Sequence, residues 1–360
     1  MLSPIVVEEL RIPDTLDDPD AEPFRAIVDI YNLVNAHVMG PAAGIATAAE
    51  MLVSFQDQEY TRIRVFAISR DAAVVAMAYF AWSVEPDTRV SWIDIRVRPE
   101  YRNQGFGSAL HDHLEQLSRD SGRPIVQGQG LHEAVDGDDR LTPPTGFGSL
   151  PVYESTVQFM IARGYSLEQV NRVSILHLPI PAPRLEDLLS TAQIRAGSEY
   201  RVHTWEGSTP ERWLNDVALI MNRMSTDAPS GNLEIEEETW DADRVRHYDE
   251  LRNRTGRIRL VAAVEYIPGG QLVAFNGLSQ SEDRTQPVHQ GVTLVLKEHR
   301  GHRLGMITKV ANIQQLQALR PGSPSIITDN AEENRPMLDV NEAVGFLPLA
   351  YQGAWKKTFA

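Results

Sequence analysis

The chain has 360 residues, of which 42% are apolar and 23% charged, and its formal net charge at pH 7 is −15. This length predicts about two domains, because one domain typically takes roughly 100–200 residues. The chain has no Cys, which excludes disulfides, thiolate metal sites and a cysteine nucleophile. The acidic balance argues against a nucleic-acid partner, since phosphate binding needs clustered Lys and Arg.

The sequence also argues against a membrane or secretory protein. No apolar run approaches the roughly 18–20 residues that span a bilayer, so we expect no membrane partner. The first residues, MLSPIVVEELRIPD, lack the basic and then apolar regions of a signal peptide, and we expect a cytoplasmic location. Acidic residues gather at 17–20, 136–139 and 234–238. They form either a solvated surface or a rim that attracts a cationic amine.

Hydrophobic periodicity divides the first half of the chain into strands and helices. In chain order we expect a strand over 5–12, helices over 24–37 and 47–55, strands over 62–68, 73–80 and 93–97, a helix that ends near 117, a strand over 124–129, a helix over 154–163 and a strand over 172–178. In the strand over 93–97, apolar Ile93, Ile95 and Val97 alternate with charged residues, which is the two-residue period of a half-buried strand.

A glycine loop joins this strand to the next helix. Pro99 ends the strand ladder because it has no N–H group to donate, and Arg102-Asn103-Gln104-Gly105-Phe106-Gly107 follows. Glycines at such a turn let backbone N–H groups point into the loop, where the helix N-terminus adds partial positive charge. The pattern predicts a phosphate cradle. It lacks the Lys-Ser/Thr pair of nucleotide-triphosphate loops and the third glycine of the dinucleotide fingerprint.

The second half of the chain repeats the first. The segment PIPAPR, residues 179–184, predicts a stiff connector, so we expect a domain over 1–180, a Pro-rich linker over 181–198 and a second domain over 199–360. Beyond it we expect strands over 200–205, 257–266 and 271–277, helices over 210–224 and 244–253, and a second strand-loop-helix unit over 291–317. Glu100-Tyr101-Arg102 and Gly107 recur 198 residues later as Glu298-His299-Arg300 and Gly305. A fixed offset is typical of an internal repeat.

The Arg-x-x-Gly-x-Gly loop, in this strand and helix context, resembles that of the GNAT superfamily of acyl-CoA-dependent N-acyltransferases. The order of elements is similar to that of the tandem GNAT proteins of actinobacteria. The resemblance implies an α/β fold of two tandem GNAT-like domains, each a mixed, mostly antiparallel sheet flanked by helices, with a splayed central strand pair. It implies acetyl-CoA as the co-substrate, with its pantetheine between the splayed strands and its pyrophosphate on the glycine loop. The implied acceptor is an amine of a small molecule.

The resemblance assigns residues to a donor site in each copy. They are Ile95, Val97, Arg102, Asn103, Gln104, Gly105, Phe106, Gly107 and Ser108 in the first copy, and Val295, Arg300, Gly301, His302, Arg303, Gly305 and Asn334 in the second. The second loop departs from the pattern, because Arg303 stands where the first copy has Gly105. Arg303 either blocks the phosphate or adds a positive partner for it. Asn334 and Asn330 either face the pantetheine or cap the helix that begins near Arg335.

Amide formation needs a neutral amine, a polarised thioester and a proton for the departing thiolate. Many relatives supply that proton from a Tyr four residues before the final Gly-aromatic pair, but this chain has Met160 and Asn341 there. Tyr153 is the candidate acid in its place, and the alternative is a packing tyrosine. Asp94 is the candidate base, and the alternative is an exposed strand carboxylate.

The other polar candidates are expected to line the site. Gln127, Gln129 and His132 lie along the strand over 124–129 and its exit, close to the acyl group. His132 is a further candidate base, although a loop histidine is more commonly solvated. The histidines include no His-Glu-x-x-His motif, and His111 and His113 are two apart and cannot share a helix face. We therefore expect no metal site.

Three hypotheses of function follow. The first is an acetyl-CoA-dependent N-acetyltransferase in which the amine attacks the thioester directly, with either domain as the catalyst. The second is an acyltransferase whose donor is borne by an acyl carrier protein or a tRNA. The arginines that would dock an acidic carrier, or would form an ordinary solvated helix face, are Arg244, Arg246, Arg252 and Arg254. The third is a non-catalytic CoA-binding module, which the missing tyrosine favours.

Overall fold

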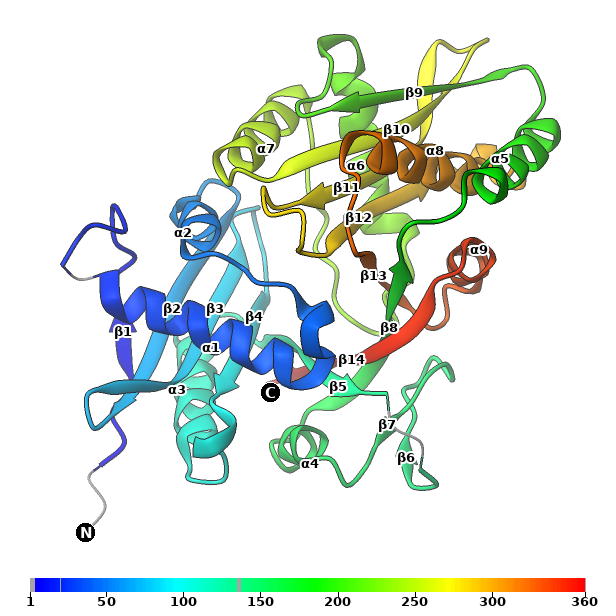
Figure 1. Ribbon diagram of the computed structural model, residues 1–360. Coiled ribbons are helices and arrows are strands. Elements are labelled where there is room, and N and C mark those ends of the chain that lie inside the picture. Colours follow the sequence, from blue (N-terminus) through cyan, green and yellow to red (C-terminus); the bar gives the residue numbers. More distant parts are fainter. Residues whose placement is uncertain (1–3, 20, 135–136, 360) are drawn as a thin grey trace. The chain divides into compact units, whose positions relative to one another are not determined.

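The computed structural model describes residues 4–19, 21–134 and 137–359 (Figure 1), so Asp20 and Asp136 of the acidic clusters lie outside it. The chain forms two compact units. The first comprises Met1–Arg172, Ser230–Glu236 and Ala350–Ala360, and the second comprises Val173–Pro229 and Glu237–Leu349. These units differ from the expected domains, because two segments of the second half of the chain lie in the first unit.

Most elements of the first unit form where periodicity predicts them. They are β1 (Glu8–Leu10), α1 (Ala21–Met39), η1 (Gly40–Ala43), α2 (Ala48–Gln56), β2 (Thr61–Arg70), β3 (Ala73–Ser83), β4 (Val90–Val97), η2 (Pro99–Tyr101), α3 (Phe106–Asp120), β5 (Ile125–Glu133), β6 (Arg140–Leu141), β7 (Leu150–Pro151) and α4 (Ser155–Ala162). The strands β8 (Ser166–His177) and β14 (Leu347–Thr358) have residues in both units. The short pair β6–β7 lies between β5 and α4, and the sequence did not predict it.

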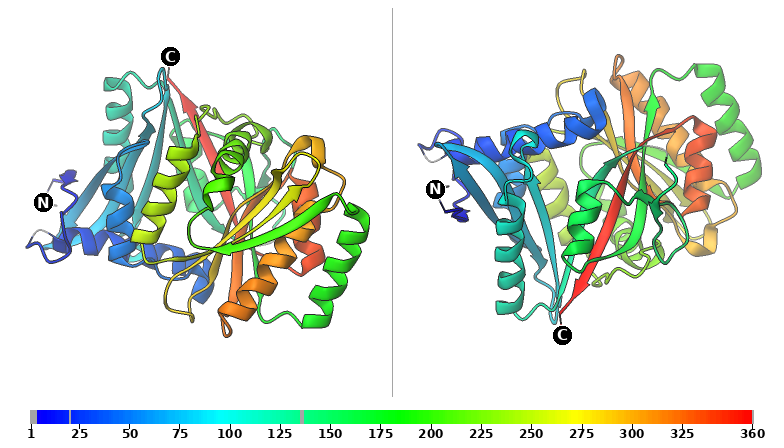
Figure 2. Two further views of the ribbon diagram at one scale, coloured as in Figure 1. Left: turned by 90° about the horizontal axis from the view of Figure 1, so that it is seen from above. Right: turned by 90° about the horizontal axis from the view of Figure 1, so that it is seen from below.

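The strand order in the first unit is β1-β2-β3-β4-β5-β14-β8. The strands β4 and β5 pair in parallel. Alternate residues of β2 reach different cores: Phe66 and Ile68 pack with α3, whereas Val65 and Ala67 pack with α1 and α2. A strand directs successive side chains to opposite faces, so helices cover the sheet on both sides. Figure 2 shows α1 and α3 on these two opposite faces.

The C-terminal strand completes the first unit. Residues of β14 pair antiparallel with β5 from Ala350↔Glu133 to Thr358↔Ile125. Trp355 is fully buried and belongs to the same core as α3. The expected domain over 199–360 is therefore not one compact body, because burial of Trp355 draws this strand into the other sheet. A strand's own pattern shows that one face is buried but does not identify the sheet that it joins.

The second unit repeats this arrangement. Its elements are α5 (Ala182–Ala196), β9 (Tyr200–Glu206), η3 (Glu211–Trp213), α6 (Leu214–Asp227), α7 (Ala242–Arg254), β10 (Ile258–Tyr266), β11 (Gln271–Gln280), β12 (Val288–Val295), η4 (Lys297–His299), α8 (Leu304–Leu319), β13 (Ser325–Ala331) and α9 (Arg335–Val344). The strand order is β8-β13-β12-β11-β10-β9, with β12 and β13 parallel. The expected α/β fold with a mixed, mostly antiparallel sheet in each unit is confirmed.

The expected linker over 181–198 is wrong, because most of it forms helix α5. A proline occupies its first turn, where a helix lacks N–H partners in any case, and Gly197 follows its last residue. Leu185 and Ala192 are buried in the core of the second unit. The prolines therefore start a packed helix instead of forming a free connector.

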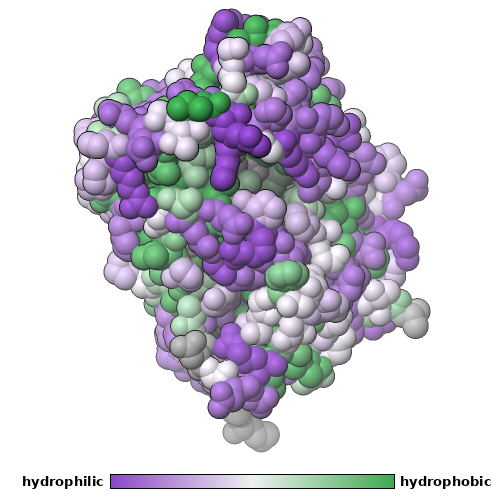
Figure 3. Space-filling view, turned by 90° about the vertical axis from the view of Figure 1, so that its right-hand side faces the viewer, coloured by the Kyte–Doolittle hydropathy of each residue, from purple (hydrophilic) through white to green (hydrophobic). Residues whose placement is uncertain are grey.

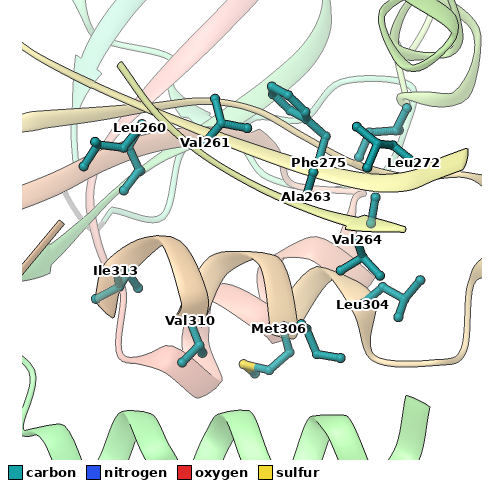
Figure 4. Packing of buried hydrophobic residues seen from close by; sticks show 14 of the residues in the cluster. Leu260, Val261, Ala263, Val264, Leu272, Phe275, Leu304, Met306, Val310 and Ile313 are labelled. Atoms are coloured by element: carbon teal, nitrogen blue, oxygen red, sulfur yellow. The ribbon is translucent and has the colours of Figure 1, made fainter. Parts of the chain in front are cut away.

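Helix α8 is enclosed on two sides. Figure 4 shows Leu304 beside Val264 of the sheet, while Met306 and Val310 point away from the strands toward α5. Buried residues run without a break from Leu304 to Ile313. A helix with apolar residues all round is one that is buried all round, which agrees with this packing.

The surface is mainly polar. On the face shown in Figure 3, hydrophilic residues predominate and hydrophobic residues are scattered. Scattered apolar residues are normal on protein surfaces. Across the described ranges, no single helix has the length and apolar content of a membrane span, and one bent pair, Ala21–Ala43 with Ala48–Gln56, passes that test by length and composition only.

Candidate active site

The first unit contains a gap between two parallel strands. The ladder between β4 and β5 runs from Val90↔Ile125 to Ile93↔Gly128 and ends there, although β4 continues to Val97 and β5 to Glu133. The splayed pair is therefore confirmed. Gly128 is required where the strands part, since a Cβ there would lie 2.8 Å from the carbonyl oxygen of Ile93. The strands approach so closely because residue 128 has no side chain.

We expect Gly128→Ala to lower the free energy of unfolding by about 1–3 kcal/mol, because the new methyl group meets a backbone atom that cannot rotate away. Urea denaturation measures this change. Gly291→Ala is the control, since a Cβ at that strand position meets nothing within 4 Å. Its stability should be unchanged or raised by less than about 1 kcal/mol. Equal stability of both variants would show that β4 and β5 are not in close contact at Gly128.

The glycine loop brings helix α3 to the open end of this gap. Gly105 has φ of +89°, a left-handed conformation that glycine adopts readily, and Asn103 has φ of +61°. The N–H of Ala109 donates a hydrogen bond to the carbonyl of Gly105. The N–H groups of the residues before Ala109 in the first turn have no carbonyl partner within the helix. No side chain caps this helix. These N–H groups and the positive end of the helix can therefore receive an anionic oxygen.

A cavity of about 590 Å³ joins the loop to the gap. Its lining includes the predicted residues Asp94, Ile95, Val97, Arg102, Asn103, Gly105, Phe106, Gly107, Ser108 and Tyr153. Gln104 is not part of the lining and instead donates a hydrogen bond to the carbonyl of Glu100 at 3.3 Å. The volume lies within the range of small-molecule and cofactor sites, roughly 300–1,000 Å³.

Asp94 lies in the cavity beside a half-buried arginine. Arg96 Nε donates to Asp94 Oδ1 at 3.1 Å, and Arg96 Nη2 donates to Asp94 Oδ2 at 2.8 Å. Arg96 also donates to the Asn35 side chain at 2.6 Å and lies over the ring of Tyr31. Both carboxylate oxygens of Asp94 are thus engaged by one guanidinium group.

The other predicted catalytic positions also line the cavity. Met160 lines it where many relatives have a tyrosine. Tyr153 also lines it and is 59% exposed. Nearby on α3, burial lowers the pKa of His111 to about 4, so this histidine is neutral at physiological pH. Its Nε2 lies 3.2 Å from the hydroxyl of Tyr165.

The sequence missed a buried pair in this cavity. His132 is 1% exposed, not solvated, and its Nδ1 is hydrogen-bonded to Glu154, the residue before α4. Trp355, from the last strand, lines the same cavity. Hydrogen bonding to His132 lowers the pKa of Glu154 even though burial opposes this shift. No local pattern identifies these three residues as neighbours, because they come from β5, the start of α4 and β14.

The second unit keeps the splayed strand pair, but the loop before α8 has a residue with a large side chain where the first unit has a glycine. The β12–β13 ladder ends at His289↔Ile327, and the buried side chains of Gln290 and Thr328 then bond at 3.0 Å. Arg303 has φ of +59°, so it keeps the left-handed conformation that Gly105 has in the first unit. A non-glycine residue there costs about 1–2 kcal/mol.

The other loop residues of the second unit already have partners within it. Arg300 donates to Asp227 at 2.9 Å and to the carbonyl of Val295 at 3.2 Å. The ring of His302 lies 5.2 Å from that of Tyr200. Gly301 (φ +86°) and Gly305 keep the turn into α8. These contacts occupy groups that a phosphate would otherwise use.

The asparagines of the second unit do not act as a helix cap. Asn334 is the residue before α9, but its side chain makes no capping hydrogen bond. Asn330 instead accepts a hydrogen bond from the Asn341 side chain at 2.7 Å. At the position of His111, offset by 198 residues, this unit has Lys309. Lys309 is fully buried, and its Nζ has no hydrogen-bond partner in the described part of the chain.

The arginines of α7 differ in exposure. Arg244 is 5% exposed and donates to the carbonyl of Thr239 and to Glu238. Arg246 is exposed and pairs with Glu211 and Asp243, Arg252 is half-buried and bonds to Tyr248, and Arg254 is exposed. The acidic partners of Arg244 and Arg246 reduce the charge available to an acidic carrier protein. Among the residues that the structure describes, no group of three or more His, Asp or Glu could hold a metal ion.

Residues 37–127, which include β4, the glycine loop and α3, match the model of the acetyltransferase (GNAT) family. Over these residues the chain is similar to that family. A segment of 170 residues is 26% identical to the mycothiol acetyltransferase of Rothia mucilaginosa (strain DY-18). This match covers 47% of the chain and 43% of that protein, so it spans less than half of the relative.

Solved structures extend the likeness to the whole chain. A tandem GNAT protein from the clavulanic acid biosynthesis pathway superposes with a TM-score of 0.72 at 20% identity, covering 99% of this chain and 98% of that one. A GCN5-related N-acetyltransferase from Sphaerobacter thermophilus has a TM-score of 0.60 at 14% identity, with 98% and 95% coverage. At such identities the likeness concerns the fold, and the fold is that of a tandem GNAT protein.

Proposed function

We propose that the chain is an N-acetyltransferase that takes its acetyl group from acetyl-CoA in the first unit and passes it to an amine of a small molecule. The observation that carries the proposal is the meeting of the open β4–β5 gap and the uncapped N-terminus of α3 in one cavity. An extended pantetheine would pair with the edge of β4. The pyrophosphate oxygens would accept hydrogen bonds from the N–H groups in the first turn of α3. Arg102 lies in the same lining and would add positive charge.

The reaction is direct attack of a neutral amine on the thioester carbon. A C–N bond forms as the C–S bond breaks, and the thiolate leaves with the electron pair and takes up a proton. Asp94 and Tyr153 stay predictions for the base and the acid. Asp94, Glu133 and Glu154 line the cavity, so its negative charge favours an acceptor that arrives as a cation.

The first unit is the better donor site of the two. The first loop presents helix N–H groups to a cavity, whereas the corresponding arginine of the second loop, Arg300, is paired with Asp227. We place acetyl-CoA in the first unit and give the second unit no catalytic role. This proposal does not depend on the predicted domain boundary near residue 180, because the compact units divide the chain differently. It uses only the repeat in the sequence.

The test combines binding and turnover. Acetyl-CoA binding is measured by calorimetry, and transfer of labelled acetyl is measured to 1,5-diaminopentane, glucosamine and lysine ethyl ester. Binding with transfer to at least one amine is expected. Binding without transfer would favour a non-catalytic CoA-binding module. Absence of binding would overturn the proposal in favour of an acyl donor carried by a protein or a tRNA.

A further inference from the structure

Two nitrogens in the cavity of the first unit are buried without a hydrogen-bond partner. They are Nε2 of His132, which is 1% exposed, and Nε1 of Trp355, which is 0% exposed. Neither has a partner anywhere in the described ranges of the chain. Buried polar groups in native proteins are nearly always paired, with protein, water or ligand. These two therefore indicate a place where another molecule binds.

Two glycines on facing strands lie beside these nitrogens. Gly130 of β5 lies directly opposite Gly353 of β14 in the antiparallel ladder. A Cβ at Gly353 would lie 2.6 Å from Leu150 Cδ1, 2.9 Å from Trp355 Nε1 and 3.2 Å from His132 Nε2, and a Cβ at Gly130 would lie 3.3 Å from His132 Nε2. A side chain at either position would therefore press on the histidine ring. We call the part of the cavity that Gly130, His132 and Trp355 line the glycine hollow.

The partner of the histidine sets its chemistry. Nδ1 of His132 is hydrogen-bonded to the carboxylate of Glu154, which places the ring hydrogen of the neutral imidazole on Nδ1. Nε2 then carries a lone pair and accepts a proton. Trp355 Nε1–H is a donor only. The hollow thus offers one acceptor and one donor, which suits an amine or an amine bridged through one water.

We propose that His132 is the catalytic base of acetyl transfer and that Glu154 is its positioning residue. The inference rests on the proposed function. One proton of the acceptor's ammonium group passes to Nε2, and the resulting imidazolium is stabilised by Glu154. The neutral amine then forms the C–N bond as the C–S bond of acetyl-CoA breaks, and the second amine proton leaves through the hollow to solvent. The thiolate takes its proton from solvent.

His132 is a better base than Asp94 on geometric grounds. Both oxygens of Asp94 accept hydrogen bonds from Arg96, so its charged form is already satisfied. His132 has an unpartnered acceptor nitrogen next to a carboxylate. This arrangement of a nucleophile-activating imidazole oriented by a third group recurs in unrelated enzymes.

The test compares three variants in the transfer assay with 1,5-diaminopentane, glucosamine and lysine ethyl ester. We expect His132→Gln to lower kcat about 10²–10⁴-fold and Glu154→Gln to lower it about 10–10²-fold, with acetyl-CoA affinity unchanged in both. His113→Gln is the control, because His113 is exposed on α3 and is not part of the cavity lining. Its kcat should match that of the wild type.

Two further measurements separate catalysis from folding. Gly130→Ala keeps His132 but covers its Nε2, and it should also lower kcat. Nitrogen-15 NMR of the wild type should show His132 with its hydrogen on Nδ1, and Glu154→Gln should shift this tautomer. A His132→Gln variant that retains kcat within about twofold, or a histidine with its hydrogen on Nε2, would overturn this inference while the proposed function stands. A wild type that neither binds acetyl-CoA nor acetylates any of the three amines would overturn both.

Discussion

Gly107→Trp is expected to weaken acetyl-CoA binding about 100-fold or more, whereas Gly305→Trp should leave it unchanged. The two glycines are matched positions in the first turns of α3 and α8. A Cβ at Gly107 would lie 3.6 Å from Val97, and a Cβ at Gly305 would lie 3.7 Å from Val295. An indole at residue 107 therefore enters the loop end of the cavity, where the pyrophosphate is proposed to bind. Calorimetry of acetyl-CoA binding measures the effect.

Both glycines have ordinary helical backbone, so the backbone of each helix accepts a side chain there. Gly305 is buried and Gly107 is half-buried, so Gly305→Trp is the more demanding test of folding. Loss of binding in Gly305→Trp alone would move the donor site to the second unit. Loss in both variants would mean that the substitutions act through folding, and circular dichroism would detect this.

Lys309→Met is expected to stabilise the protein, because it removes a buried ammonium group that has no hydrogen-bond partner in the described residues and only a 5.7 Å contact with the ring of Phe346. Lys309 is 0% exposed, and burial lowers its pKa from 10.5 to about 7. At 1.36 kcal/mol for each pH unit, this difference corresponds to a cost of up to about 5 kcal/mol when the group is charged. Methionine has a similar length and fits an apolar site without a charge.

The pH dependence gives the sharper result. Below about pH 7 the lysine is charged in both the folded and unfolded states, so the full cost is present and constant. Between pH 7 and 10.5 only the unfolded state holds the proton, and the stability of the wild type should rise with pH. Lys309→Met should lack this rise. Urea denaturation of the wild type and of Lys309→Met at about pH 6, 7, 8 and 9 measures the pH dependence of stability in each protein.

Lys297→Met is the control for this comparison, since Lys297 is exposed in the turn before α8. It should change neither the stability nor its pH dependence by more than about 0.5 kcal/mol. If Lys309→Met lowered stability and left the slope intact, Lys309 would have a stabilising partner and the assignment would be wrong.

Local sequence accounts for the elements and for their repetition. The alternation of Ile93, Ile95 and Val97 places β4, and the change to helical spacing after Gly107 places α3. Both follow from periodicity, which depends only on neighbours along the chain. The offset of 198 residues between Gly107 and Gly305 likewise indicates two related units without any structure. The splayed pair and the phosphate-binding turn follow from the family that these motifs resemble.

The partners of these elements depend on contacts between distant residues, and here the sequence was insufficient. Nothing in the residues around Trp355 indicates that the last strand joins β5 and completes the cavity of the first unit. His132 has the appearance of a solvated loop histidine until Glu154 and Gly353 close around it. Burial and pairing are determined by residues far apart in the sequence, such as Gly130 and Gly353, which are 223 residues apart. A local pattern contains no information about which of them meet. The sequence thus specifies the type of each element and the loop proposed to bind the donor, whereas long-range packing selects the groups that line the cavity beside it.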